Sequence, residues 1–311
     1  MVTLEQLRVL QALDKAAGVS QAAEQLGKAQ SAVSYTLKTL EESLGVTLLD
    51  RSTYRARLTA AGQAVLKKGQ QILAMTDELD SLAAEFRGGC EARVDILLDG
   101  ILPVASIMPV LQPLVERRGP TQIRLRVELV GGVAEAIEST QPDLVLAPMD
   151  LYGTAAPYEK RIMGEAVMLP VVATEHPLAR FTPPVPIAEL RRHIHLVVSD
   201  SSKFKAPIDA GLVGADTVWN FPDFHSRLEG LRAGLGFAWM PTYLIEQDVR
   251  ANKLTPLRLE RHTVQRFQVA LAHRTSPPLG RTGRHLLELM ASQKDFLPPP
   301  NPELLKLVSG G

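Results

Sequence analysis

The sequence is poor in the residues that mark several protein classes. It holds a single cysteine, Cys90, so no disulfide can form within the chain and a thiol-pair redox switch is excluded. It has no run of eighteen apolar residues and no signal-peptide pattern, from which we expect a soluble, cytoplasmic protein without a membrane partner. Lys plus Arg and Asp plus Glu are balanced at 34 each, so any preference for a charged partner must come from a local surface.

Patterns typical of metal sites and common enzymes are also missing. Seven histidines are present, and His193 and His195 would share one strand face, but no cysteine, histidine or acidic cluster accompanies them. Gly211 and Gly214 are not followed by the Lys-Ser/Thr of a phosphate-binding loop, and there is no nucleophile elbow. We therefore expect no metal, no cofactor and no catalysis. The 311 residues, 45% of them apolar, suffice for two or three packed units.

The most specific signal lies near the amino terminus, where apolar residues recur at helical spacing on three short segments, the last two being residues 22–26 and 33–44. Gly27 separates these two and, lacking a Cβ, allows a sharp turn. We expect Ser20 and Ser31 to cap the two helices. Two helices joined by a glycine turn predict a helix-turn-helix, which places its second helix in the DNA major groove.

Polar and basic side chains in the same region are suited to contacts with DNA. The polar face of the third segment can hydrogen-bond base edges or phosphates. Alternation in residues 46–51 and 55–59 predicts two short strands and a turn, a wing whose arginines bring positive charge. Residues 1–68 hold nine Lys/Arg and six Asp/Glu, a local excess of positive charge. The expected DNA-binding residues are Gln30, Ser31, Ser34, Tyr35, Lys38, Arg51, Arg55 and Arg57.

This region resembles the winged helix-turn-helix of LysR-type transcriptional regulators. The matching residues are Leu4–Leu7, Ser31–Ser34, Leu40–Val46 and Leu58–Gly62. Family members often carry arginine where this chain has Tyr35, which can instead reach a phosphate or contact a thymine methyl. The resemblance extends, more weakly, to Pro177–Ala179 and Ala233–Pro241 in the second half.

Residues 59–89 predict a long connecting helix that ends at a glycine hinge. A strict heptad of apolar residues argues for helix–helix association, although an ordinary amphipathic helix packed on its own domain would give a similar stripe. The resemblance implies that this helix makes a homodimer and that dimers form a homotetramer. The heptad residues are Leu58, Val65, Ile72, Leu79 and Phe86, with Leu66, Leu73, Met75 and Leu82 beside them.

Strand and helix patterns alternate through residues 90–300 and predict open parallel sheets. The expected fold class is α/β with an all-helical-plus-wing amino-terminal domain. The resemblance implies two Rossmann-like subdomains of the periplasmic-binding-protein type, joined by two crossover strands. The expected organisation is a DNA-binding domain at 1–58, a linker helix at 59–89, subdomain I at about 91–165 and 267–297, subdomain II at about 166–266, and a mobile tail at 301–311.

In such sheets ligands bind beyond the carboxyl ends of strands and at helix N-termini. Asp99 stands where many family members have serine or threonine, and its carboxylate would repel an anion. We therefore expect that an effector is not held by its own carboxylate at Asp99. The expected effector-binding residues are Asp99, Gly100, Ile101, Leu102, Gly131, Gly132, Ser201, Ser202 and His225.

Two functions are compatible with these patterns. The first is a regulator that binds promoter DNA and responds to a small molecule, which changes the angle between the two α/β units and so the spacing of the DNA-binding domains. The alternative is a small-molecule-binding protein or enzyme whose amino-terminal region serves only dimerisation. The polar face around Ser34 and Lys38 favours the first, because a mere dimerisation module does not need it.

Overall fold

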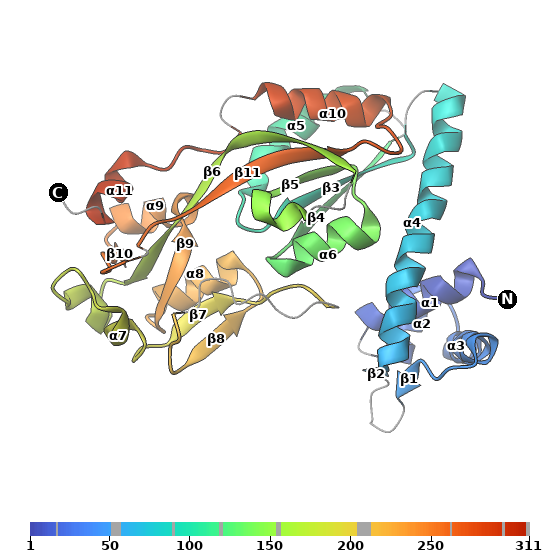
Figure 1. The fold of residues 1–311 in the computed structure, drawn as a ribbon, viewed down its shortest axis with the longest axis horizontal. Coiled ribbons are helices and arrows are strands. Elements are labelled where there is room, and N and C mark those ends of the chain that lie inside the picture. Colours follow the sequence, from blue (N-terminus) through green and yellow to red (C-terminus); the bar gives the residue numbers. More distant parts are fainter. Residues whose placement is uncertain are drawn as a thin grey trace. The chain divides into compact units, whose positions relative to one another are not determined.

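A computed structural model shows a chain that divides into two compact units, Met1–Gly88 with Glu138–Gln141, and Gly89–Ile137 with Pro142–Gly311 (Figure 1). The structure describes residues 1–16, 18–50, 57–88, 91–117, 121–153, 157–203, 213–261, 263–293 and 296–308, without the side chains of 77, 78, 80–88 and 117.

Three helices open the amino-terminal unit: α1 Leu4–Lys15, α2 Val19–Gln25 and α3 Gln30–Leu44. Between α2 and α3 the backbone passes through Gly27 in the left-handed region, φ +62°, which confirms the predicted glycine turn. The capping prediction is wrong. Both helices begin one residue before the expected serines, so Gly18 and Ala29 are the N-cap residues and neither provides a side-chain cap. Their apolar faces meet in a core that includes Leu10, Ala22, Val33, Leu37 and Leu40.

The predicted wing and long helix are both present. Strands β1 Leu49–Asp50 and β2 Arg57–Leu58 pair antiparallel, and α4 Ala60–Gly88 follows directly. No helix of the described residues combines the length and apolar character needed to span a membrane.

The apolar stripe of α4 is divided between two faces. Leu66 and Leu73 are buried, and Gly69 lies against Leu7 of α1, so this side of the helix packs on its own domain. Ile72, Met75 and Leu79 are 45%, 62% and 64% exposed, although they belong to the same stripe. Packing on its own domain thus accounts for Leu66 and Leu73, and it leaves Ile72, Met75 and Leu79 exposed. The side chains of Leu82 and Phe86 lie outside the described residues.

A nine-stranded mixed sheet forms the centre of the second unit, in the order β4-β3-β5-β11-β6-β9-β7-β8 with β10 paired to β6. The strands β3, β4 and β5 are mutually parallel, as are β7, β8 and β9, whereas β6 and β11 run antiparallel to their neighbours and link the two halves. This confirms two α/β subdomains with two crossover strands. The strand bounds are β3 Arg93–Asp99, β4 Gln122–Glu128, β5 Leu144–Pro148, β6 Tyr158–Ala173, β7 His195–Val198, β8 Val218–Phe221, β9 Phe237–Pro241, β10 Leu254–Pro256 and β11 Gln265–Arg274.

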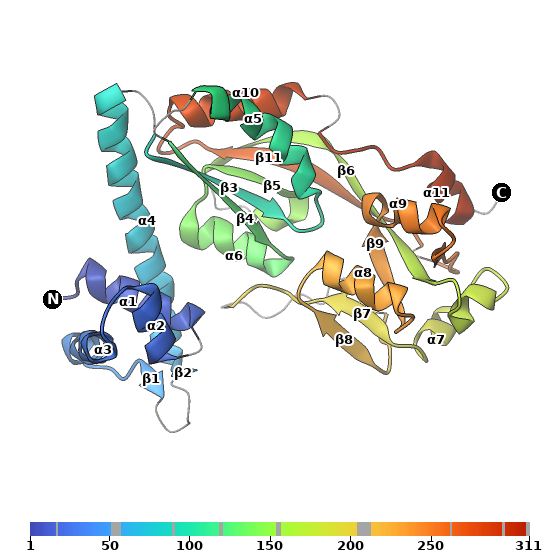
Figure 2. The ribbon, with the colours of Figure 1, turned by 180° about the vertical axis from the view of Figure 1, so that it is seen from behind.

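Helices cover both faces of the sheet in subdomain I (Figures 1 and 2). Along β3, Ile96 and Leu98 pack in one apolar cluster and Leu97 in another, because successive side chains point to opposite faces. A helix predicted near residues 204–210 lies outside the described residues. The helix bounds are η1 Val104–Ile107, α5 Met108–Arg117, α6 Gly131–Thr140, η2 Met149–Tyr152, η3 Pro177–Arg180, α7 Ile187–Leu190, α8 Phe224–Arg232, α9 Thr242–Arg250, α10 Arg281–Ser292 and α11 Pro302–Val308.

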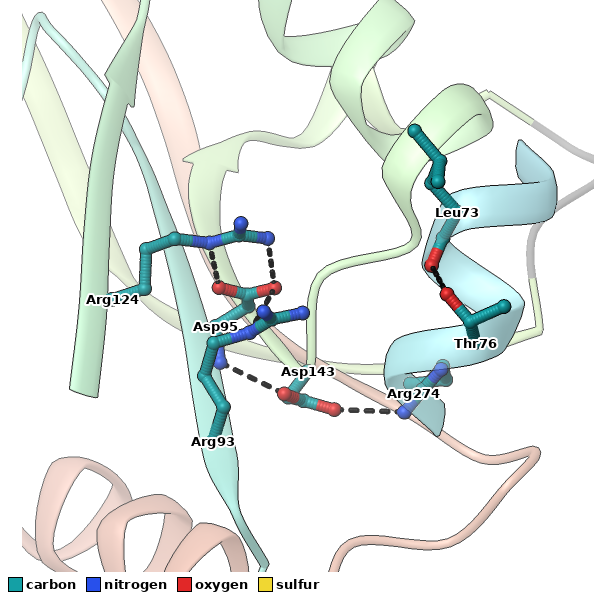
Figure 3. A network of polar contacts seen from close by, with 7 residues as sticks. All are labelled: Leu73, Thr76, Arg93, Asp95, Arg124, Asp143 and Arg274. Carbon is teal, nitrogen blue, oxygen red and sulfur yellow. Dashed lines mark hydrogen bonds and ion pairs between the residues drawn. The ribbon is translucent and has the colours of Figure 1, made fainter. Parts of the chain in front are cut away.

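A polar network links strands β3, β4 and β11 through Asp143, the residue before β5 (Figure 3). Arg124 of β4 donates two hydrogen bonds to the Asp95 carboxylate of β3. The Asp95 backbone N–H donates to Asp143 Oδ2 at 2.8 Å, and Arg274 Nη2 of β11 donates to Asp143 Oδ1 at 2.8 Å. Burial raises the pKa of Asp143 despite these contacts. The network fixes the amino-terminal ends of β3 and β4, and it does not involve their carboxyl ends.

The carboxyl-terminal segment differs from its prediction. Residues 302–308 form helix α11, with Leu304 and Val308 buried, where a mobile tail was expected. Asn301 Nδ2 donates to Glu246 Oε1 of α9 at 2.7 Å, and α11 packs against β10. The chain thus passes from α10, which packs on subdomain I, to a docking place on subdomain II.

Candidate functional site

The exposed face of α3 presents the predicted polar residues together. Gln30, Ser31, Ser34, Tyr35 and Lys38 are all exposed, whereas Val33, Leu37 and Leu40 of the same helix are buried. Helical periodicity separates the two faces. Tyr35, 69% exposed, has no packing role that would explain an aromatic side chain there.

The end of α3 is held by residues of one of the segments that match the family, Leu40–Gly45, which has the pattern Leu-Glu-x-x-Leu-Gly. Gly45 ends the helix in the left-handed conformation, φ +69°, which favours glycine. Glu41 Oε1 accepts hydrogen bonds from the backbone N–H groups of Leu48 and Leu49, at 2.8 and 3.0 Å. A single carboxylate thus fixes the wing's first strand against the carboxyl-terminal end of α3.

A second matching segment, Leu58–Gly62 with the pattern Leu-Thr-x-x-Gly, holds the other strand of the wing. Thr59 Oγ1 donates to Thr47 O at 2.8 Å and accepts from Gly62 N at 3.0 Å. A Cβ on Gly62 would lie 2.2 Å from Leu48 O, so only glycine allows this approach of α4 to the wing.

The lysine on the exposed face of α3 makes only a weak ion pair. Lys38 Nζ lies 3.8 Å from Glu42 Oε1, with side chains 68% and 62% exposed, and such exposed pairs contribute little to stability. Lys38 can therefore exchange this partner for a phosphate at small cost. Arg57 is exposed on β2, whereas Arg51 and Arg55 lie outside the described residues.

Some predicted effector residues meet where the two subdomains approach each other. Ser201 Oγ donates to Glu128 Oε2 at 2.7 Å and accepts from Leu129 N at 2.8 Å. Gly132 N donates to Asp200 Oδ1 at 3.2 Å, so a carboxylate of subdomain II sits at the N-terminus of α6. The loops after β4 and β7 thus contact each other directly.

This contact depends on glycine. A Cβ on Gly132 would lie 1.9 Å from Ser201 Oγ, and one on Gly131 would lie 2.7 Å from Asp200 Oδ2. Ser202 Oγ, beside the contact, is buried without a hydrogen-bond partner among the described residues. Buried hydroxyls are nearly always paired, so this one marks a place where another group is expected.

Asp99 lies buried at the carboxyl end of β3, 5% exposed. Its Oδ1 accepts from Ile101 N at 2.7 Å. Burial raises its pKa to about 7, and repulsion by Asp150 acts in the same direction. The carboxyl group is thus partly neutral near physiological pH, and it shapes the following loop rather than facing a cation.

Two of the predicted effector-binding residues, Ile101 and Leu102, line a groove. Ile101 and Leu102 form one wall, together with residues that no sequence argument had selected. The groove is small and partly open to solvent: the centre of a water-sized sphere can occupy only about 20 Å³ of it. Its lining residues are Ile101, Leu102, Pro103, Glu165, Ala166, Val167, Pro241, Thr242, Tyr243, Leu297, Pro298 and Pro300.

The signal for Pro241–Tyr243 was present in the sequence. These residues directly follow strand β9, so the rule that ligands lie beyond the carboxyl ends of strands would have selected them. His225, predicted by that rule, is exposed on the first turn of α8 and does not line the groove. Nearby Arg227 is buried, donating to Trp239 O and Met240 Sδ, and burial lowers its pKa to about 9.

Known families match both halves of the chain. Residues 4–63 match "Bacterial regulatory helix-turn-helix protein, lysR family", and residues 91–295 match "LysR substrate binding domain". The chain belongs to the LysR family. It is a DNA-binding transcriptional regulator with an effector-binding domain, of winged helix-turn-helix and α/β architecture.

Relatives and solved structures are similar to this LysR-type chain over most of its length. The probable HTH-type transcriptional regulator YhaJ of Escherichia coli K12 is 29% identical over 255 residues, covering 81% of this chain and 85% of the relative. Full-length OxyR of Pseudomonas aeruginosa, as a single-residue variant, is 19% identical with a TM-score of 0.54, covering 97% and 98%. Full-length CbnR in complex with its target DNA is 17% identical with a TM-score of 0.54, covering 93% and 99%. At these identities the solved structures show a shared fold.

No cluster of three His, Cys, Asp or Glu that could hold a metal ion occurs within the described parts of the chain. The curated relatives carry the names of transcriptional regulators.

Proposed function

We propose that this LysR-type regulator reads promoter DNA with the exposed polar face of α3, pairs through α4, and responds to a small molecule bound at the carboxyl ends of its sheet strands. The observation that carries the proposal is the α3 face itself. Five polar side chains are exposed on one side of a helix whose other side buries Val33, Leu37 and Leu40.

For DNA binding, α3 has the position of a recognition helix, the second helix of the helix-turn-helix. Gln30, Ser34 and Tyr35 provide donors and acceptors for base edges, and Lys38 provides charge for a phosphate. The wing arginines, Arg57 with the predicted Arg51 and Arg55, would extend the contact to the backbone or the minor groove.

Pairing is assigned to the exposed face of α4. Ile72, Met75 and Leu79 recur at spacings of three and four residues, and none of the described residues of their unit buries them. A second copy of the helix would cover them, giving a homodimer that presents two α3 helices to two half-sites. A homotetramer would follow from a further contact between dimers.

The effector is assigned to the region between the subdomains. The direct contacts of Ser201 with Glu128 and of Asp200 with Gly132 correspond to a closed arrangement, and Ile101 with Leu102 lines the adjoining groove. A ligand that favours a different angle between the subdomains would shift this equilibrium by its differential affinity for the two arrangements. Because its target is promoter DNA, we place the protein in the cytoplasm.

DNA binding is tested by fluorescence anisotropy on the protein's own upstream intergenic DNA, against a scrambled duplex, over a salt series. We expect sequence-selective, salt-dependent binding by the parent protein. Lys38→Ala should weaken binding several-fold and reduce the salt slope by about one, because one phosphate contact is lost.

Lys68→Ala is the matched control. Lys68 is an exposed lysine on α4, its Nζ donating to Gln71 Oε1 at 3.2 Å, so the substitution removes the same charge away from α3. Equal binding to both duplexes, or equal losses in the two variants, would contradict the proposal and favour the alternative in which the amino-terminal region only dimerises.

A further inference from the structure

Residues 296–308, here called the carboxyl-terminal strap, cross from one subdomain to the other and are buried at both ends. Phe296 and Leu297 at the start of the strap, and Leu304 and Val308 in α11, are all buried and belong to one apolar cluster. Figures 1 and 2 show the strap running from the side of α10, which packs on subdomain I, to α11 beside α9 and β10 of subdomain II. The family match ends before the strap begins. The strap is therefore a third connection between the subdomains, in addition to β6 and β11.

The first anchor of the strap lies on a bend of the crossover strand β6. The pairing of β6 with β11 shifts between Ile162 and Gly164, which leaves Met163 as a β-bulge. Gly164 has φ +139°, a backbone conformation that favours glycine. A Cβ on Gly164 would lie 3.7 Å from Leu297 Cδ1, so the Leu297 side chain packs directly beside the bulge. A bulge bends a strand, and Leu297 covers this bend where β6 passes from subdomain I to subdomain II.

Beside this anchor the strap faces loops of both subdomains across the small groove. Leu297, Pro298 and Pro300 line the groove together with residues 101–103, which follow β3 of subdomain I, and residues 241–243, which lead into α9 of subdomain II. The groove has room for little more than a water molecule, so these three segments lie close together. A change in the angle between the subdomains would therefore have to displace the strap.

The second anchor is helix α11 on subdomain II. Leu304 and Val308 lie four residues apart on one face of α11 and are 3% and 4% exposed, whereas Leu307 is 57% exposed. The helix packs against β10, and Asn301 Nδ2 donates to Glu246 Oε1 of α9 at 2.7 Å. Two buried apolar side chains and one hydrogen bond thus fix the end of the strap to subdomain II.

The segment between the two anchors is stiff. Pro298, Pro299 and Pro300 are consecutive. Each proline ring fixes the backbone φ angle, so a run of prolines is held in an extended conformation. Such a run acts as a semi-rigid spacer and cannot absorb a change in the distance between its ends.

We propose that the carboxyl-terminal strap is a splint that holds the two subdomains at their closed angle, and that α11 leaves its docking place when they separate. The inference rests on the proposed function, because it names what opposes the change of angle that a ligand would bring about. An effector that favours the open arrangement works against the docking of α11, so the strap sets how much differential affinity the response requires.

Hydrogen–deuterium exchange of the full-length protein tests the proposal, because several backbone amides report on contact between the subdomains. The N–H groups of Leu129, Gly132, Ser201 and Lys203 donate across the boundary to Ser201 Oγ, Asp200 Oδ1, Leu129 O and Glu135 Oε2, respectively. None of these residues lines the groove beside the strap. Faster exchange at these reporter amides in a strap variant thus means that the subdomains separate more often.

Leu304→Asp places a carboxylate on the buried face of α11 and should undock the helix. We expect exchange at the reporter amides to become on the order of tenfold faster, with the amides of residues 96–98 at the centre of β3 unchanged as the reference for global unfolding. Leu307→Asp makes the same change on the exposed face of the same helix and should follow the parent protein.

A second variant tests the stiffness of the strap. Replacing Pro298, Pro299 and Pro300 together by glycine leaves the buried residues of α11 in place but makes the spacer flexible. The reporter amides should again exchange faster than in the parent, while the amides of residues 302–308 keep the parent's rates. This variant keeps the proposal testable if Leu304→Asp does not fold.

Exchange that rises only within residues 302–308 of Leu304→Asp, equal changes in Leu304→Asp and Leu307→Asp, or parent-like reporter amides in the glycine variant would overturn the proposal. DNA anisotropy on the same preparations distinguishes this failure from failure of the proposed function. Selective DNA binding with parent-like reporter amides overturns the splint and leaves the regulator. Faster reporter exchange in a protein without selective DNA binding overturns the proposed function and leaves the splint.

Discussion

Asp99 combines burial with a position at the end of β3, next to the residues that line the groove. A carboxyl whose folded-state pKa lies above its unfolded value holds its proton more tightly in the folded protein. The contribution of Asp99 to the stability of the folded state is therefore most favourable below pH 4, becomes less favourable as the pH rises from 4 to 7, and is least favourable above pH 7. Asp99 thus makes the effector domain more stable at mildly acidic than at alkaline pH.

Replacing Asp99 by asparagine should remove this dependence. The amide can still accept the hydrogen bond from Ile101 N, but it cannot ionise. Asp99→Asn should therefore be stabilised relative to the parent at pH 8, by at most on the order of 4 kcal/mol, with the gain shrinking toward pH 4. Differential scanning calorimetry across this range measures it.

Asp216→Asn, at an exposed position, is the control and should follow the parent at every pH. Parallel stability curves for Asp99→Asn and the parent between pH 4 and 8 would show that Asp99 does not ionise in this range in the folded protein.

At the scale of elements, the wing is positioned by three short-range contacts rather than by its own two strands. Glu41 holds Leu48 and Leu49, Thr59 reaches Thr47, and Gly62 allows α4 to approach Leu48 O. Two strands of two residues each are too short to be stable alone. The residues of the family strings therefore act as supports for the wing.

Gly62→Ala should disrupt this support. Its Cβ would lie 2.2 Å from the Leu48 carbonyl oxygen and 3.1 Å from Leu58 Cδ2, so backbone must shift. We expect a destabilisation of about 1–3 kcal/mol and weaker DNA binding, measured by thermal unfolding and anisotropy. Gly18→Ala meets no atom within 4 Å, and at the N-cap of α2 it should cost less than about 1 kcal/mol. Equal destabilisation in the two variants would show that the contact with Leu48 is not the cause.

At the scale of the whole molecule, the proposed pairing would use apolar surface that a single chain leaves exposed. Ile72, Met75 and Leu79 expose apolar area on α4, although Leu66 and Leu73 of the same stripe are buried. A regulator that contacts two half-sites needs a second recognition helix at a defined distance. The exposed face of α4 is where the second copy is expected.

Leu79→Glu should therefore weaken the dimer. Placing a carboxylate on each helix of the pair buries unpaired, like charges. Sedimentation velocity at micromolar concentration should show a shift toward monomer, with lower DNA affinity. Val115→Glu, at a 74% exposed position of α5, serves as the control. A dimer of unchanged strength in Leu79→Glu would move the interface away from this face.

Local patterns in the sequence were enough to predict the helices, the turn and the wing of the amino-terminal unit. The buried and exposed faces of α3, the turn at Gly27 and the wing follow from spacing within a few residues, which local backbone geometry obeys directly. The N-caps of α2 and α3 were missed by two residues, because capping serines are a preference and not a requirement. The alternation of strands and helices likewise indicated the two subdomains and the crossover strands.

Only the tertiary structure decided which residues meet. Ser201 contacts Glu128, and Leu102 shares a groove with Tyr243 and Leu297, across long stretches of sequence. No periodicity encodes such pairs, since they depend on how strands are ordered and how loops turn. The same holds for α11: residues 301–308 follow a proline run and read as a tail, and only the apolar surface of subdomain II that receives Leu304 and Val308 makes them a docked helix. Sequence determined the elements and the exposed polar face of α3, because these rest on neighbouring residues, whereas burial between distant segments decided which residues line the groove.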